Sequence, residues 1–295
     1  MKVSFGSWAF SFGPYANQPV PFFDIARKLS VAGYDGIEVC GFPPHITLED
    51  YPEVSSRRDV ARRLGDLGLG VSGYSADLTL VNPTLVGNKQ TYIDLFARNV
   101  DLCSAIGSPS VRVDTCTAPG IISDEEAPDM MSRLAEAWHA AADLAMRAGV
   151  KVVWEFEPGF AFNKPSEVVD LHTLVGHPNF SILFDTAHAH MCSTMCARQT
   201  GKREKLGGGV AAMLRMCEGR IGHLHLVDSD GTLYGEETSA HRPFGEGEIP
   251  FFKFAESLRA TGVEWWCVDM CFCKESWEQV EPSLKFVRSL QRAGV

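Results

Sequence analysis

Residues 130–157 read MMSRLAEAWHAAADLAMRAGVKVVWEFE. Apolar residues spaced three and four apart up to Gly149 predict a helix that ends on this glycine, which tolerates a left-handed helix cap. The β-branched and aromatic run from Lys151 to Glu157 predicts a strand directly after the helix. This stretch therefore predicts one helix-to-strand step of an α/β fold.

The same alternation of strand and helix runs through the whole chain. Strands are predicted at 3–10, 36–42, 70–76, 110–115, 151–157, 181–187, 222–228 and 264–270. Helices are predicted at 22–33, 56–68, 91–107, 130–149, 166–176, 209–219, 250–262 and 276–294. Eight strand-then-helix units predict a (β/α)8 TIM barrel that forms a single domain over residues 1–295. A doubly wound open sheet is the alternative, but the first predicted strand lacks the Gly-x-Gly-x-x-Gly turn of dinucleotide-binding sheets.

The composition limits the partners of the chain. Its formal net charge of −10, from 27 Lys and Arg against 37 Asp and Glu, disfavours binding to nucleic acid or an anionic membrane. The start of the chain lacks the cationic flank and long apolar run of a leader peptide, and nine scattered cysteines are typical of free thiols. We therefore expect a cytoplasmic protein with a small ligand, and a homo-oligomer or a partner subunit stays open.

Charged and polar side chains stand at or near the carboxyl ends of the predicted strands. They are Glu38, Asp114, Glu155, Glu157, Asp185, His223, His225 and Asp269. In a TIM barrel these ends meet at one mouth, where the active site forms, so we expect the side chains to converge. Several carboxylates buried together are unfavourable unless a cation offsets their charge. Three carboxylates and one imidazole suit Mn²⁺, Mg²⁺ or Co²⁺, so the pattern predicts a metal site.

Each of these residues also has a plain structural interpretation. A single aspartate at a strand end, such as Asp185, often caps the helix that follows. A lone histidine in a β-run, such as His223 or His225, is usually packed in the core. Alternation along a strand places Glu155 and Glu157 on the same face, so periodicity alone does not choose between them.

Six motifs along the chain resemble one protein superfamily. They are GYDGIEV (33–39), WEFEPGFAFNKPSEV (154–168), HPNFSILFDTAHAH (177–190), GHLHLVDSDG (222–231), PFGEGEIPF (243–251) and CVDM (267–270). With them the chain resembles the xylose-isomerase-like barrel superfamily of sugar isomerases, epimerases and inosose dehydratases. The resemblance implies one divalent metal ion, with Mn²⁺ favoured and Mg²⁺, Co²⁺ or Zn²⁺ as alternatives. The ligands that it implies are Glu155, Asp185, His225 and Asp269.

The resemblance also implies a chemistry and its residues. It implies a sugar isomerase or epimerase that abstracts a proton next to a metal-bound carbonyl of an unphosphorylated sugar or keto sugar. Glu155 is the first candidate for the base and Asp269 the second, and His188 of the D-x-x-H pattern is expected to contact substrate. The residues expected to bind substrate are Glu157, His188, His241, Trp8 and Asp114.

Two departures from the family pattern keep other functions open. Asp269 stands where the epimerases usually have Glu, and the arginine that they place just after the strand-7 histidine is missing. A metal-dependent eliminase, similar to an inosose dehydratase or to a 3-keto-glycoside or C-glycoside deglycosidase, is therefore the alternative. An endonuclease-IV-like phosphodiesterase is less favoured because the chain is acidic. An inactive binding barrel is the remaining alternative.

Overall fold

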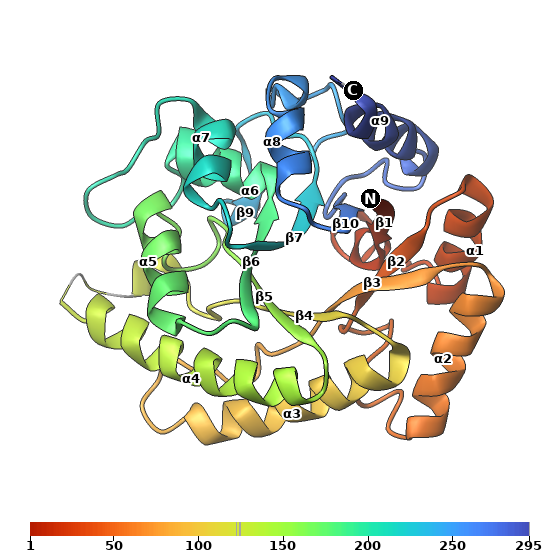
Figure 1. The fold of residues 1–295 in the computed structure, drawn as a ribbon, viewed down its shortest axis with the longest axis horizontal. Helices are drawn as coiled ribbons and strands as arrows, with labels where there is room; N and C mark the ends of the chain where they lie inside the picture. Colours follow the sequence, from red (N-terminus) through yellow and green to blue (C-terminus); the bar gives the residue numbers. More distant parts are fainter. Residues whose placement is uncertain (122, 124, 295) are drawn as a thin grey trace.

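The computed structural model describes residues 1–121, 123 and 125–294, and its centre is a closed barrel of eight parallel strands (Figure 1). The strands are β1 (Lys2–Gly6), β2 (Gly36–Cys40), β3 (Gly70–Ser75), β4 (Ser110–Val113), β5 (Lys151–Glu155), β6 (Phe180–Asp185), β7 (Ile221–Leu226) and β10 (Trp265–Val268). They close in the order β1-β10-β7-β6-β5-β4-β3-β2, in which neighbours in sequence are neighbours in space. This confirms the predicted single-domain TIM barrel.

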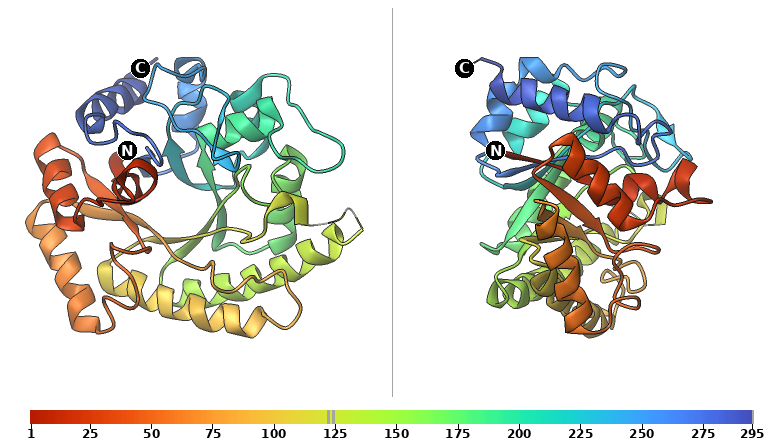
Figure 2. Two further views of the ribbon diagram at one scale, coloured as in Figure 1. Left: turned by 180° about the vertical axis from the view of Figure 1, so that it is seen from behind. Right: turned by 90° about the vertical axis from the view of Figure 1, so that its right-hand side faces the viewer.

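Helices surround the barrel on its outside (Figures 1 and 2). They are α1 (Phe22–Ala32), α2 (Val54–Asp66), α3 (Lys89–Ile106), α4 (Ala127–Arg147), α5 (Pro165–Val175), α7 (Gly209–Met216), α8 (Ala255–Ala260) and α9 (Val280–Arg292). Each of the eight predicted helices overlaps one of them. On α4, Leu134, Trp138 and Ala141 are buried at spacings of three and four, which explains why this helix packs on the sheet.

The main core lies between the barrel and the helices. The strands are nearly continuous apolar runs because parallel strands covered by helices are buried on both faces. The Trp138 ring of α4 lies 5.4 Å from the Trp154 ring of β5 and 5.4 Å from the Phe180 ring of β6, measured between centroids. These contacts fix the direction of β5 and β6, whose carboxyl ends carry Glu155 and Asp185.

The mouth of the barrel differs in detail from the sequence prediction. The run Ser7–Phe10 forms the 3₁₀ helix η1 instead of extending the first strand, and β5 ends at Glu155, so Glu157 lies in the loop that follows. A short helix α6 (Thr186–His190) and a π-helical turn η4 (Met191–Met195) follow β6 directly. A two-stranded hairpin, β8 (Leu233–Tyr234) and β9 (Thr238–Ser239), stands after β7. These elements shape the space above the strand ends.

Three further 3₁₀ turns lie in the loops: η2 (Gly13–Tyr15), η3 (Pro119–Ile121) and η5 (Phe251–Lys253). None of the helices in the described residues is long and apolar enough to cross a membrane.

Candidate active site

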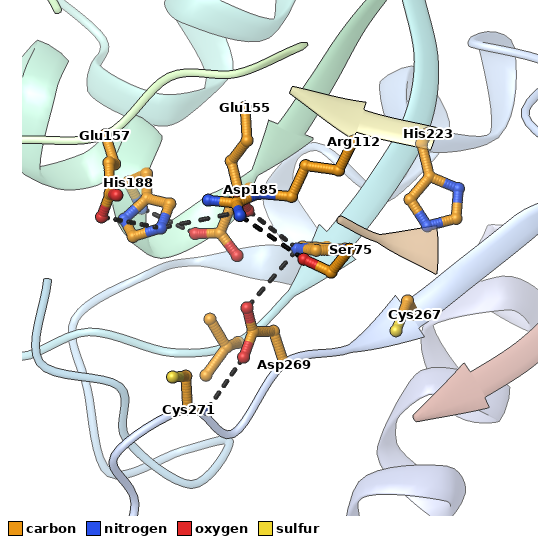
Figure 3. Close-up of polar contacts among 12 residues, drawn as sticks. Ser75, Arg112, Glu155, Glu157, Asp185, His188, His223, Cys267, Asp269 and Cys271 are labelled. Atoms are coloured by element: carbon orange, nitrogen blue, oxygen red, sulfur yellow. Dashed lines mark hydrogen bonds and ion pairs between the residues drawn. The ribbon is translucent and has the colours of Figure 1, made fainter. Parts of the chain in front are cut away.

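Four side chains from the last four barrel strands meet at the mouth. Glu155, Asp185 and His225 lie on β5, β6 and β7, and Asp269 follows β10 directly. One ligand atom from each of the four lies within 4.8 Å of the others, and all four residues are buried. Figure 3 shows Glu155, Asp185 and Asp269 turned toward one region, whereas His223 lies apart from them. We call this group the carboxylate cluster.

The imidazole of His225 joins the carboxylates of the cluster. The register of β6 and β7 places His225 opposite Asp185. Its Nδ1 lies 2.9 Å from Glu155 Oε1 and 3.4 Å from Asp269 Oδ2. Burial opposes a charge on His225, but the carboxylates of Glu38 and Glu155 raise its pKa well above the usual value. A proton on His225 thus offsets part of the negative charge, and a metal ion that bound there would replace this proton.

The two carboxylate oxygens of Asp185 have different surroundings. Oδ1 accepts a hydrogen bond of 2.7 Å from the backbone N–H of His188 and so caps α6. Oδ2 is buried and has no hydrogen-bond partner among the described residues. A buried oxygen without a partner costs about 1–3 kcal/mol. The capping role is therefore present, and the second oxygen fits a cation bound to the carboxylate cluster.

A second layer of residues holds His225 from behind. His225 Nε2 lies 3.2 Å from each carboxylate oxygen of Glu38 on β2, and His223 Nε2 lies 2.6 Å from Glu38 Oε2. His225 Nε2 therefore bonds Glu38, and His225 Nδ1 faces the carboxylates of the cluster. Such a carboxylate behind a histidine ligand fixes its tautomer and its ring orientation.

A partly buried arginine holds Glu155 from the other side. Arg112 Nε of β4 forms an ion pair with Glu155 Oε2, and Arg112 Nη1 lies 3.6 Å from Asp114 Oδ2 and 3.4 Å from Ser75 Oγ. Although burial opposes the charge on Glu155, Arg112 lowers its pKa to about 2. Sequence reasoning missed Arg112, yet alternation along the strand puts it on the same face as Asp114.

Glu157, His188 and His241 line the space above the carboxylate cluster. His188 Nε2 lies 3.7 Å from Glu157 Oε2, and His188 Nδ1 lies 2.8 Å from Ser239 Oγ of β9. The Thr238 hydroxyl donates a hydrogen bond to Glu157. His241 Nδ1 lies 3.4 Å from Asp269 Oδ1. Burial raises the pKa of Glu157 to about 7 and lowers that of His188 to about 3. The hairpin thus orients Glu157 and His188, two of the five residues expected to bind substrate.

Trp8 and Asp114 lie on the same cavity. Trp8 Nε1 donates a hydrogen bond of 2.8 Å to Asp269 Oδ1, and its ring centroid lies 5.3 Å from that of His225. Gly6 leaves room for the indole, since a Cβ at this position would lie 2.3 Å from the Trp8 ring. Asp114 Oδ1 accepts a hydrogen bond from the backbone N–H of Cys116.

The cavity has a volume of about 390 Å³ and brings together most of the residues singled out in the sequence. Those that line it are Trp8, Asp114, Glu155, Glu157, His188, His241 and Asp269. Asp185 and His225 lie within ligand distance of Glu155 and Asp269. The arrangement offers a candidate cation site at one end of a cavity that is large enough for a small ligand.

The sequence profile of the xylose isomerase-like TIM barrel family matches residues 26–290. Because this match spans most of the chain, the protein belongs to the xylose isomerase-like TIM barrel family. No curated protein sequence matches the chain.

Several solved structures share the whole fold. D-psicose 3-epimerase in the presence of D-fructose has a TM-score of 0.74 at 16% identity, with 98% of this chain and 99% of that chain covered. The IolI protein with a bound zinc atom has a TM-score of 0.72 at 18% identity, with 98% and 96% covered. The probable 3-DHS dehydratase AsbF from Bacillus anthracis has a TM-score of 0.71 at 17% identity, with 98% and 99% covered. At these identities the similarity establishes the fold.

Proposed function

We propose that this protein is a divalent-metal-dependent sugar isomerase or epimerase that acts on an unphosphorylated sugar or keto sugar. The observation that carries the proposal is the carboxylate cluster at the end of the cavity, with Asp185 Oδ2 buried and unpartnered within the described residues. The sugar epimerases among the solved structures with this fold support the choice of substrate.

Glu155, Asp185, His225 and Asp269 would hold the ion. Three carboxylates and one imidazole favour Mn²⁺, with Mg²⁺ and Co²⁺ next, and the zinc atom in IolI keeps Zn²⁺ as an alternative. The ion would supply a Lewis acid that polarises a ketone oxygen and makes the neighbouring C–H more acidic. The chain itself must bind the sugar and move the proton.

The hydrogen bonds and ion pairs that Glu155 and Asp269 already form support metal-ligand roles for both residues. Glu155 uses one oxygen for Arg112 and the other for His225. Asp269 Oδ1 accepts from Trp8 and from the backbone N–H of Cys271, and Oδ2 faces His225. Neither carboxylate is left with an oxygen that turns freely to a substrate carbon.

We therefore assign the proton transfer to Glu157 and the binding of hydroxyl groups to His188 and His241. Glu157 lines the cavity and is held by Thr238 instead of by the carboxylate cluster. His188 Nε2 faces Glu157, so both groups can reach the same part of a bound sugar.

A metal-dependent eliminase is the second candidate. An epimerase needs two bases on opposite faces of the substrate carbon, and the contacts of Asp269 favour a ligand role over that of a second base. One base and one cation are sufficient for isomerisation or for elimination. The 3-DHS dehydratase with this fold supports keeping the elimination reaction.

The proposal can be tested by incubating the Mn²⁺-loaded protein with a panel of keto sugars and inososes in D₂O and following the products by NMR. We expect deuterium next to the carbonyl, and this exchange should stop when EDTA removes the metal. Return of the proton gives an isomer or epimer, whereas an unsaturated ketone identifies the eliminase. A protein that binds no metal and exchanges no proton contradicts the proposal.

All nine cysteines are free thiols, which supports a reducing compartment. We therefore propose the cytoplasm as the location.

A further inference from the structure

The cavity has two chemically different walls. One part of the lining is charged and polar, and it consists of the groups already described together with Thr79, Arg198 and Glu237. The other wall is apolar and is built from Trp8, Phe12, Cys40, Phe42, Cys271 and Phe272. Except for Phe272, these residues belong to a small apolar group around Trp8, Cys40 and Cys267 that is separate from the main core. The apolar wall is therefore not an extension of the core that happens to reach the surface.

Three rings of this wall and the ring of Tyr234 form a continuous series of aromatic contacts. The ring centroids of Tyr234 and Phe272 lie 4.3 Å apart with the planes 8° from parallel. Phe272 is stacked on Phe12 at 6.4 Å, and Phe12 meets the edge of Phe42 at 5.6 Å. The rings come from the hairpin after β7 and from the loops after β10, β1 and β2. We call Phe12, Phe42, Tyr234 and Phe272 the aromatic ladder.

The backbone at Phe272 has an unfavourable conformation, and this conformation positions the Phe272 ring in the aromatic ladder. Phe272 has φ of +62°, in the left-handed region that non-glycine residues rarely occupy. The facing Gly13, at φ of +54°, has no side chain that would block the ring. A Cβ at Gly13 would lie 2.9 Å from Phe272 Cδ1 and 3.3 Å from the Tyr234 hydroxyl oxygen. Such strain is typical of ligand-binding sites, where a particular side-chain position is needed.

A free sugar meets the apolar part of this cavity only with the C–H face of its ring and leaves most of it unused. It carries a hydroxyl group on almost every carbon, and hydroxyls that face an apolar wall lose their hydrogen bonds to water without gaining new ones. A flat apolar group loses nothing there and gains contact with the rings. The cavity therefore fits a ligand with one polar end and one flat apolar end.

We infer that the substrate is a glycoside or keto-glycoside with an aromatic aglycone, whose sugar lies at the carboxylate cluster and whose aglycone lies on the aromatic ladder. This inference rests on the proposed function for the position of the sugar. It adds a second binding subsite for an aryl group and makes Phe272 a residue that determines specificity.

The inference is tested with phenyl and methyl β-D-glucopyranoside, which have no ketone and so stay intact during a calorimetric titration of the Mn²⁺-loaded protein. The phenyl glucoside should bind roughly tenfold more tightly or better. Phe272→Ala should remove this preference and leave the affinity for the methyl glucoside unchanged. Phe252→Ala, at a ring that is 57% exposed and does not line the cavity, is the matched control.

Three outcomes overturn the inference. They are equal affinity for the two glucosides, no binding of either, and tighter binding of cellobiose than of the phenyl glucoside, which would make the ladder a second sugar site. If Phe272→Ala does not fold, Phe272→Leu keeps the apolar volume and should still weaken the phenyl preference. The metal content of the same samples separates the two proposals. Mn²⁺ binding without a phenyl preference contradicts only the subsite, whereas a phenyl preference without Mn²⁺ contradicts only the proposed function.

Discussion

Replacing Glu38 by Gln should weaken metal binding although Glu38 is not in the carboxylate cluster. Glu38 is 1% exposed and bonds two imidazoles, at 2.6 Å to His223 Nε2 and 3.2 Å to His225 Nε2. Gln keeps the shape of the Glu38 side chain but removes its negative charge. This charge would make His225 a stronger ligand for a metal ion. Gln also replaces one of the two acceptor oxygens by an NH₂ group, so the two imidazoles must share the remaining carbonyl oxygen or one of them must present an acceptor nitrogen to the NH₂ group.

The expected loss is about 10–100-fold in metal affinity, which corresponds to about 1.4–2.7 kcal/mol. Titration of the metal-free protein with Mn²⁺ in a calorimeter measures it directly, without any need for substrate. Asp35→Asn is the control, since Asp35 bonds the backbone N–H of Val3 and Arg288, outside the carboxylate cluster. If Glu38→Gln and wild type bind Mn²⁺ equally while both are folded, Glu38 does not act on the metal site.

Three further predictions concern residues at the cavity. Asp185→Asn should keep the cap on α6 through its remaining carbonyl oxygen yet lose bound metal, and full metal content in both Asp185→Asn and His225→Ala would show that the site is wrong. His188→Ala should keep the metal and lower kcat/KM about 10–100-fold through the lost hydrogen bond to substrate, whereas loss of metal would make His188 a ligand. Asp269→Glu should displace the bound ion, and a shift near 1 Å can lower the rate about a hundredfold. Wild-type turnover of Asp269→Glu, with deuterium entering from both faces of the sugar, would instead support a two-base epimerase.

The barrel and the cluster were predictable because both follow from position along a strand. Parallel strands align their carboxyl ends, so Asp185 and Asp269 could be placed at one mouth without knowing any side-chain contact. The sequence did not choose between His223 and His225 without the family pattern. The structure separates them, since His225 faces the carboxylate cluster and His223 faces Glu38.

The rest of the site depends on contacts that no local pattern encodes. Arg112 meets Glu155 across two neighbouring strands, at a separation of 43 residues. The hairpin that holds Glu157 and His188 consists of two strands of two residues each, too short to show a period. The aromatic ladder joins the β8–β9 hairpin to three loops, and its geometry depends on the backbone conformation of Phe272.

The residues that support the carboxylate cluster come from the other half of the barrel, and this matters when two barrels are joined in a chimera. All four cluster residues follow residue 150, whereas Glu38 and Arg112, which hold two of them in place, precede it. A chimera that keeps residues 150–295 and takes its first four strands from another barrel would keep the four proposed ligands and lose Glu38 and Arg112. We therefore expect the effect of a substitution at the proposed metal site to depend on residues in both halves of the chain.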